Sequence, residues 1–299
     1  MVSTAEENLK NKLHNDSTIP DSIERLKVLS MGSVYPYAPE LSELIRKEED
    51  KETEWLMVMK AYLSLDSSIK FTERYKKRKL FKSALRDSWA INNKNELLEQ
   101  MNYLLDGTNS QYANIQISLY CELVHKNLDI TPKNIKRTET FNKIYGDQGK
   151  SEDGYEQIVN YLVGALEIID SNSQNLLTKG WVRGFDLARV VHLVKMGYCT
   201  GLLSENEAWT IIDNLYEEFE NFDSYYEFFA SNELGNLLFD YDRELDLVKN
   251  LENRINALAP ILLDIHTPFR YLQISEDNPE SPATIYRRIF NIENIKKLK

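Results

Sequence analysis

Hydrophobic residues along this chain recur mostly at intervals of three and four, the spacing of one face of an α-helix. The chain has 299 residues with only 11 glycines and 8 prolines, so long stretches lack strong helix breakers. We predict a mostly α fold, a single multi-helix globular domain with a central helical hairpin. Helical spacing extends over residues 40–64, 70–86, 92–105, 111–126, 153–170, 182–200, 204–215, 225–239 and 241–265.

The segment 182–200 is apolar on nearly every side of a helical wheel. One broad side comprises Val182, Phe185, Val190, Leu193, Met196 and Gly197, and another comprises Leu187, Val191 and Val194. Ala188 and Lys195 define the only outward strip, with His192 near its edge. The pattern therefore predicts a core helix that faces solvent along one narrow line.

Terminal signals place this helix in a hairpin. Gly201 stands where a left-handed residue ends a helix, and Ser204 with Glu207 forms a capping box for the next one. Ser224 and Glu227 repeat the arrangement before a third helix.

The core helix carries polar residues that are candidates for a site. Asp186 lies on the broad apolar side with Arg189 one turn along, so the two are expected to pair inside the protein. We favour a structural ion pair over a ligand-binding or catalytic carboxylate held by arginine. Trp181, His192 and Tyr198 complete the candidate polar site, although large aromatic residues at helical spacing are usually core residues.

Chemistry beyond this group has little support. No HxxxH or CxxC spacing, GxSxG, P-loop or GxGxxG occurs, so we expect no metal, no cofactor and no catalytic residue. Cys121 and Cys199 are too few for a disulfide framework. The first residues lack the apolar region of a signal peptide, and no apolar run is long enough to span a membrane, which predicts a cytoplasmic protein.

Charge is unevenly distributed. The net charge is −11, yet residues 70–86 hold eight Lys or Arg against Glu73, and residues 213–246 hold eleven acids against Arg243. The negative net charge of the chain argues against binding to nucleic acid or to an anionic membrane. The inner side of the basic run is predicted to be Phe71, Tyr75, Leu80, Phe81, Ala84 and Leu85. We favour a solvated face that pairs with the acidic stretch 213–246 over a docking face for RNA, DNA or an acidic partner. The candidate interaction face comprises Arg74, Lys76, Lys77, Arg78, Lys79 and Lys82.

The residues FDLAR, GYCTGLLSENEAW and DSYYEFFASNELG, with LRDSWAINNKNELLEQMNYLL upstream, resemble an uncharacterised bacterial domain, the YbeU/YbeR-like family. The resemblance covers roughly residues 80–240 and implies a bacterial α-helical domain of unknown function. It places at motif positions Trp181, Asp186, Arg189, Gly197, Tyr198, Gly201, Glu207 and Ala208. We accordingly predict an N-terminal helical segment at 1–79, a core domain at 80–240 and a C-terminal helical extension at 241–299. The polar stretch 144–154 is a linker or a surface loop.

Two functions remain open. We favour a non-enzymatic protein-interaction or regulatory module, with an inhibitor or immunity-type role against a basic partner included, because catalytic motifs are missing and charge is uneven. The alternative is an enzyme or a small-ligand-binding protein with its site around Asp186 and Arg189.

Overall fold

The computed structural model describes residues 4–13, 18–32, 51–66, 71–145 and 182–242, together with residues 249 and 272. Every regular element in these ranges is a helix, which confirms the mostly α prediction. The helix predicted for 153–170, and most of the one predicted for 241–265, lie outside the described residues. None of the described helices is both long enough and apolar enough to cross a lipid bilayer.

Contacts between Cα atoms divide the described chain into two compact units. Unit 1 contains residues up to 106 and residues 187–228, with residue 272; unit 2 contains residues 107–145, 182–186 and 229–242, with residue 249. The predicted boundaries at 79/80 and 240/241 stay predictions.

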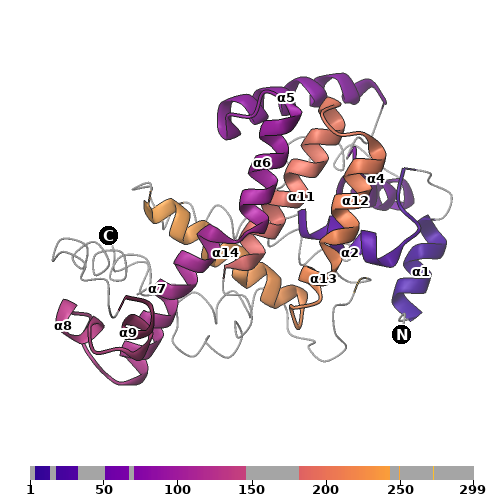
Figure 1. Ribbon diagram of the computed structural model, residues 1–299. Helices are drawn as coiled ribbons and strands as arrows, with labels where there is room; N and C mark the ends of the chain where they lie inside the picture. Colours follow the sequence, from indigo (N-terminus) through magenta and orange to yellow (C-terminus); the bar gives the residue numbers. More distant parts are fainter. Residues whose placement is uncertain are drawn as a thin grey trace. The chain divides into compact units, whose positions relative to one another are not determined.

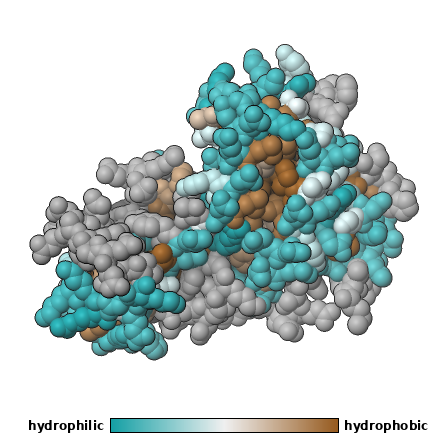
Figure 2. Space-filling model, viewed as in Figure 1, coloured by the Kyte–Doolittle hydropathy of each residue, from teal (hydrophilic) through white to brown (hydrophobic). Residues whose placement is uncertain are grey.

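Unit 1 holds most of the helices (Figure 1). It contains α1 (Thr4–Leu13), α2 (Ile23–Met31), α4 (Lys51–Leu63), α5 (Phe71–Trp89), α6 (Lys94–Leu105), α12 (Glu205–Asn214) and α13 (Tyr216–Phe219). It also contains all but the first turn of α11 (Arg183–Thr200) and the first residues of α14 (Tyr225–Asp242). Helix α2 contacts α4, α12 and α13. Figure 2 shows hydrophobic residues gathered where Figure 1 draws α6, α11 and α12, bordered by hydrophilic ones.

The hairpin between α11 and α12 is closed by the predicted glycine. Gly201 adopts a left-handed conformation with φ of 82°. The N–H of Leu202 donates to the carbonyl of Gly197 at 2.9 Å, and the N–H of Gly201 donates to the carbonyl of Tyr198 at 3.1 Å. These two bonds are a Schellman motif, which satisfies carbonyls that the helix end would otherwise leave unpaired.

The capping residues behave as the sequence predicts. Ser204 accepts the N–H of Glu207, and the Glu207 carboxylate accepts the N–H of Ser204 at 2.9 Å. At α14, Ser224 accepts the N–H of Glu227 at 3.2 Å, and the Glu227 carboxylate accepts the N–H of Asp223 at 2.6 Å, one residue before the expected partner Ser224. Each pair supplies partners for N–H groups at a helix start, which fixes where the helix begins.

Unit 2 is built around α7 (Thr108–His125), which contacts α8 (Pro132–Ile135) and α9 (Glu139–Tyr145). The Glu122 carboxylate accepts the N–H groups of Glu139 and Thr140 at 2.7 and 3.0 Å and pairs with Lys126. Partial burial alone would raise the pKa of Glu122, but these donors lower it to about 2. Glu122 therefore joins α7 to the N-terminus of α9.

Two predictions of orientation are wrong. Ala188 and Lys195, expected on an outward strip, are both completely buried, because α11 is packed on all sides. Tyr75 and Leu80, expected on the inner side of the basic helix, are 79% and 58% exposed. A helix can turn only about half of its circumference inward, and Phe81 with Leu85 occupies that half of α5.

Candidate functional site

Asp186 lies at the N-terminal end of α11, in unit 2, and is 1% exposed. Ser110, in the first turn of α7, donates a short hydrogen bond from its hydroxyl to the Asp186 carboxylate. The side chain therefore lies in the first turn of its own helix and bonds to the first turn of another. Helix N-termini carry partial positive charge, so both ends stabilise a buried carboxylate.

Neighbouring side chains satisfy the backbone at the same helix start. The N–H of Val182 donates to the Asn114 side-chain oxygen at 3.3 Å, and the N–H of Gly184 donates to the Ser231 hydroxyl at 2.8 Å. Side chains of α7 and α14 thus perform the capping that α11 lacks locally. Asp186 belongs to this polar junction of three helices.

The other residues of the candidate polar site are distributed around α11. Arg189 is 7% exposed and belongs to unit 1, so its pairing with Asp186 stays a prediction. His192 and Tyr198 are half-buried, and Trp181 lies outside the described residues. Burial, with the nearby Lys195 amine, lowers the pKa of the His192 imidazole to about 3, so His192 is neutral at physiological pH.

Lys195 is the polar residue of α11 that the sequence interpretation missed. Its side chain is 0% exposed, and its Nζ atom donates to the Tyr62 carbonyl at 2.6 Å. Tyr62 is the penultimate residue of α4, where carbonyls lack partners inside the helix. Burial lowers the pKa of the Lys195 amine to about 7; the charge of Lys77 acts in the same direction and Cys199 in the opposite one.

Cys199 extends this contact by one helical turn. Its thiol donates to the Asp66 carbonyl at 3.1 Å, just beyond the end of α4. Lys195 and Cys199 thus attach the C-terminal end of α4 to α11. Both side chains therefore have a structural role. A neutral buried amine has the chemistry of a base or nucleophile, but at 0% exposure this one lies out of reach of a solute.

The described residues offer little for metal chemistry. No group of three or more His, Cys, Asp or Glu side chains among them is arranged to hold a metal ion. His125 is exposed on α7, and the remaining histidines, His14 and His266, lie outside the described ranges.

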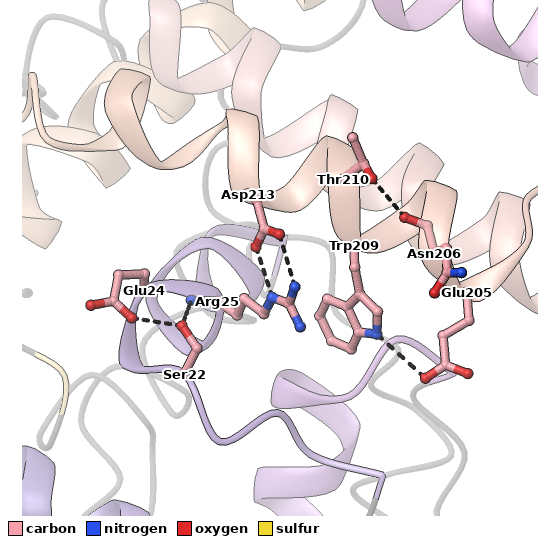
Figure 3. A network of polar contacts seen from close by, with 8 residues as sticks. All are labelled: Ser22, Glu24, Arg25, Glu205, Asn206, Trp209, Thr210 and Asp213. Atoms are coloured by element: carbon pink, nitrogen blue, oxygen red, sulfur yellow. Dashed lines mark hydrogen bonds and ion pairs between the residues drawn. The ribbon is translucent and has the colours of Figure 1, made fainter.

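A second polar network links α2 to α12 in unit 1 (Figure 3). The Arg25 guanidinium binds both carboxylate oxygens of Asp213, at 2.7 and 2.8 Å, and stacks over the Trp209 ring at 4.7 Å from its centroid. The hydrogen bond from Arg25 lowers the pKa of Asp213 and keeps that carboxylate charged. The pair therefore does not indicate a reactive site. The bidentate geometry aligns the two helices.

Two basic residues of α5 make contacts within unit 1, and three others are exposed lysines. Arg78 donates to the Thr200 carbonyl at the end of α11 at 3.2 Å, and the amine of Lys77 lies over the Phe81 ring at 5.8 Å from its centroid. Lys76, Lys79 and Lys82 are exposed. The side chain of Arg74 lies outside the described residues. Because Lys77 and Arg78 also make contacts within unit 1, the predicted interaction face contains fewer residues than the run of charges. Lys76, Lys79 and Lys82 remain in it.

The chain belongs to a domain family of unknown function. The model of the family described as Protein of unknown function (DUF1266) matches residues 84–269. The expectation of an uncharacterised family is confirmed; the YbeU/YbeR-like name and the bacterial origin stay predictions. No curated protein and no solved structure matches the chain.

Proposed function

We propose that this protein is a protein-interaction module that binds its partner through the outward face of α5. The face, called here the α5 face, consists of Tyr75, Lys76, Lys79, Leu80 and Lys82. The observation that carries the proposal is the exposure of two large hydrophobic side chains, Tyr75 and Leu80, among three exposed lysines.

The lysines of the α5 face are available to a partner. Among the described residues, none of the ion pairs involves Lys76, Lys79 or Lys82. Two acidic groups of unit 1 pair with other cations: Asp213 with Arg25 and Glu207 with Lys94. Although the chain has a net charge of −11, the lysines of this basic helix can therefore attract acidic groups of another molecule.

The apolar residues supply affinity. Burying a large hydrophobic side chain contributes about 1.5–3 kcal/mol, so Tyr75 and Leu80 together form the centre of a small interface. Aromatic residues framed by charged ones are the usual composition of binding hot spots. A regulatory role is a special case of such binding, whereas an inhibitor or immunity-type role against a basic partner gains no support from this basic face.

The alternative function, an enzyme or a small-ligand-binding protein with its site around Asp186 and Arg189, has weaker support. Both side chains are buried, and Asp186 is held by Ser110 in a junction that explains its presence structurally.

Photo-crosslinking tests the proposed function. The photoreactive p-benzoylphenylalanine replaces Tyr75 in the full chain, which is produced in cells of its source organism and irradiated. Tyr103, an exposed aromatic residue of α6, is the matched position for the control. We expect protein adducts from position 75 that disappear when Lys79→Glu and Lys82→Glu are added. Equal adducts from positions 75 and 103, or adducts insensitive to the two charge reversals, refute the proposal.

A further inference from the structure

The α5 face has the shape of one side of a helix–helix contact. Around the helix axis, at about 100° per residue, Tyr75, Lys79 and Lys82 form one row, and Lys76 and Leu80 form a second row beside it. The rows run about 10 Å along the axis, or about two turns. Phe81 and Leu85, buried on the opposite side, fix which way the rows point.

From this geometry we infer that the partner of the α5 face is an acidic amphipathic helix of another protein. The inference rests on the proposed function and names its partner class. Carboxylates at helical spacing lie opposite Lys76, Lys79 and Lys82, while apolar residues between them cover Tyr75 and Leu80. Both requirements are met on one face of one helix, with Asp or Glu and Leu-type residues at intervals of three and four.

The positive charge of α5 that is available to a partner is small and confined to a few residues. Arg86 is bound by Asp87, at 2.7 Å from Nε, and Arg78 contributes to the end of α11. Among the described side chains of α5, Lys76, Lys79 and Lys82 are the exposed lysines without an ion pair, whereas a protein that binds nucleic acid through its backbone makes about 6–10 phosphate contacts. Charges separated by more than about 8 Å are largely screened at physiological ionic strength, so a short acidic segment feels mainly these lysines.

A long polyanion meets the rest of the molecule as well. The chain outside residues 70–86 is strongly acidic, since that segment is basic and the whole carries −11. A nucleic acid or an anionic membrane extends beyond the α5 face and is repelled there. Phosphate groups alone leave Tyr75 and Leu80 without apolar contact, whereas the apolar residues of an amphipathic helix cover them directly.

Fluorescence anisotropy with a defined probe tests the inference. The probe is a labelled synthetic peptide of about 18 residues with Glu and Leu at helical spacing, long enough for about five turns. Its controls are a scrambled peptide of identical composition, a single-stranded oligonucleotide of equal charge, and phosphatidylserine-containing vesicles. The full-length protein is used throughout, in its natural form and with two pairs of substitutions.

The first pair, Lys79→Glu with Lys82→Glu, reverses the charge of the α5 face. The second pair, Lys133→Glu with Lys143→Glu, changes net charge equally at exposed positions of α8 and α9. We expect the amphipathic peptide to bind about tenfold more tightly than the scrambled one, to weaken about tenfold in the first variant, and to weaken as salt rises. The second variant should bind like the natural protein. Circular dichroism of each variant confirms that it is folded.

Failure of the inference and failure of the proposed function give different results. Equal binding of the two peptides, stronger binding of the oligonucleotide or vesicles, or no peptide binding overturns the acidic helix as partner class. If adducts from position 75 still depend on Lys79 and Lys82, the α5 face remains the interface and the sequence of the crosslinked segment gives its true partner class.

Discussion

Replacing Lys195 by methionine should remove a pH dependence from the unfolding of unit 1. The Lys195 amine has a pKa of about 7 in the folded protein because it is buried, against the ordinary lysine value of 10.5. Between these two values the unfolded chain binds a proton that the folded chain does not. The free energy of unfolding therefore rises with pH across this window, because burying the neutral amine is cheaper than burying the ammonium.

The size of the effect follows from the shift. Each pH unit well inside the window changes the free energy of unfolding by about 1.4 kcal/mol for one proton. Between about pH 7 and about pH 9.5 the wild-type protein should gain about 3 kcal/mol from Lys195. The upper limit avoids the tyrosines: burial raises the pKa of Tyr225, and burial with Glu220 raises that of Tyr216 to about 12, so their unfolded forms ionise first at higher pH.

Urea unfolding followed by tryptophan fluorescence at several pH values provides the assay. Trp55, Trp89 and Trp209 all belong to unit 1, so the signal reports mainly the unit that contains Lys195. The control is Lys133→Met, at an exposed lysine, which should keep the wild-type slope. If Lys195→Met keeps that slope too, the ammonium is charged throughout the window, and the carbonyl end of α4 outweighs desolvation.

Two further substitutions test other features of the structure. Ser110→Ala should lower the free energy of unfolding by about 1–3 kcal/mol, because it leaves the buried Asp186 carboxylate without its hydroxyl donor; thermal unfolding measures the loss, and a change below about 0.5 kcal/mol contradicts the described junction. Ala90→Gly should raise the free energy of unfolding by about 0.5–1 kcal/mol, because Ala90 has a left-handed φ of 55° that glycine adopts without strain; a lower denaturation midpoint would disprove this.

Much of the fold could be predicted from local signals. The ends of α11 and α12 depend on Gly201, Ser204 and Glu207, whose effects act within a few residues and are therefore visible in the sequence. The start of α6 at Asn93, which accepts the N–H of Glu96 at 3.1 Å, has the same origin. Helix type and helix ends are local properties, so periodicity and capping residues predict them well.

The environment of Lys195 could not be predicted by assigning one side of α11 to solvent. A helix that is apolar on every side is buried on every side, so its lysine is buried too. The helical wheel of α11 already shows this apolar character. Its partner, the Tyr62 carbonyl, is 133 residues away and backbone carbonyls have no sequence signature. Ser110 is likewise 76 residues from Asp186. Such contacts depend on how distant helices meet.

In α5 the sequence pattern gives the opposite error, because it predicts as buried residues that are exposed. The sequence pattern predicts one inner side made of six apolar residues, although their positions spread around the whole helix. Of those whose side chains the structure describes, Phe81 and Leu85 are buried, Ala84 is half-buried, and Tyr75 and Leu80 are exposed. An exposed hydrophobic residue looks like a core residue in a composition count, so a binding face is easily mistaken for packing.

The bond between Arg25 and Asp213 joins residues 188 positions apart, and this separation affects how the protein is made. Ribosomes add about 5–20 residues per second, so α2 is synthesised about 10–40 s before α12 exists. During that time Leu26 and Leu29, which are fully buried in the finished fold, lack α12 and α13, two of the helices that α2 contacts. The nascent chain therefore presents an unfinished hydrophobic surface at α2 for much of its synthesis.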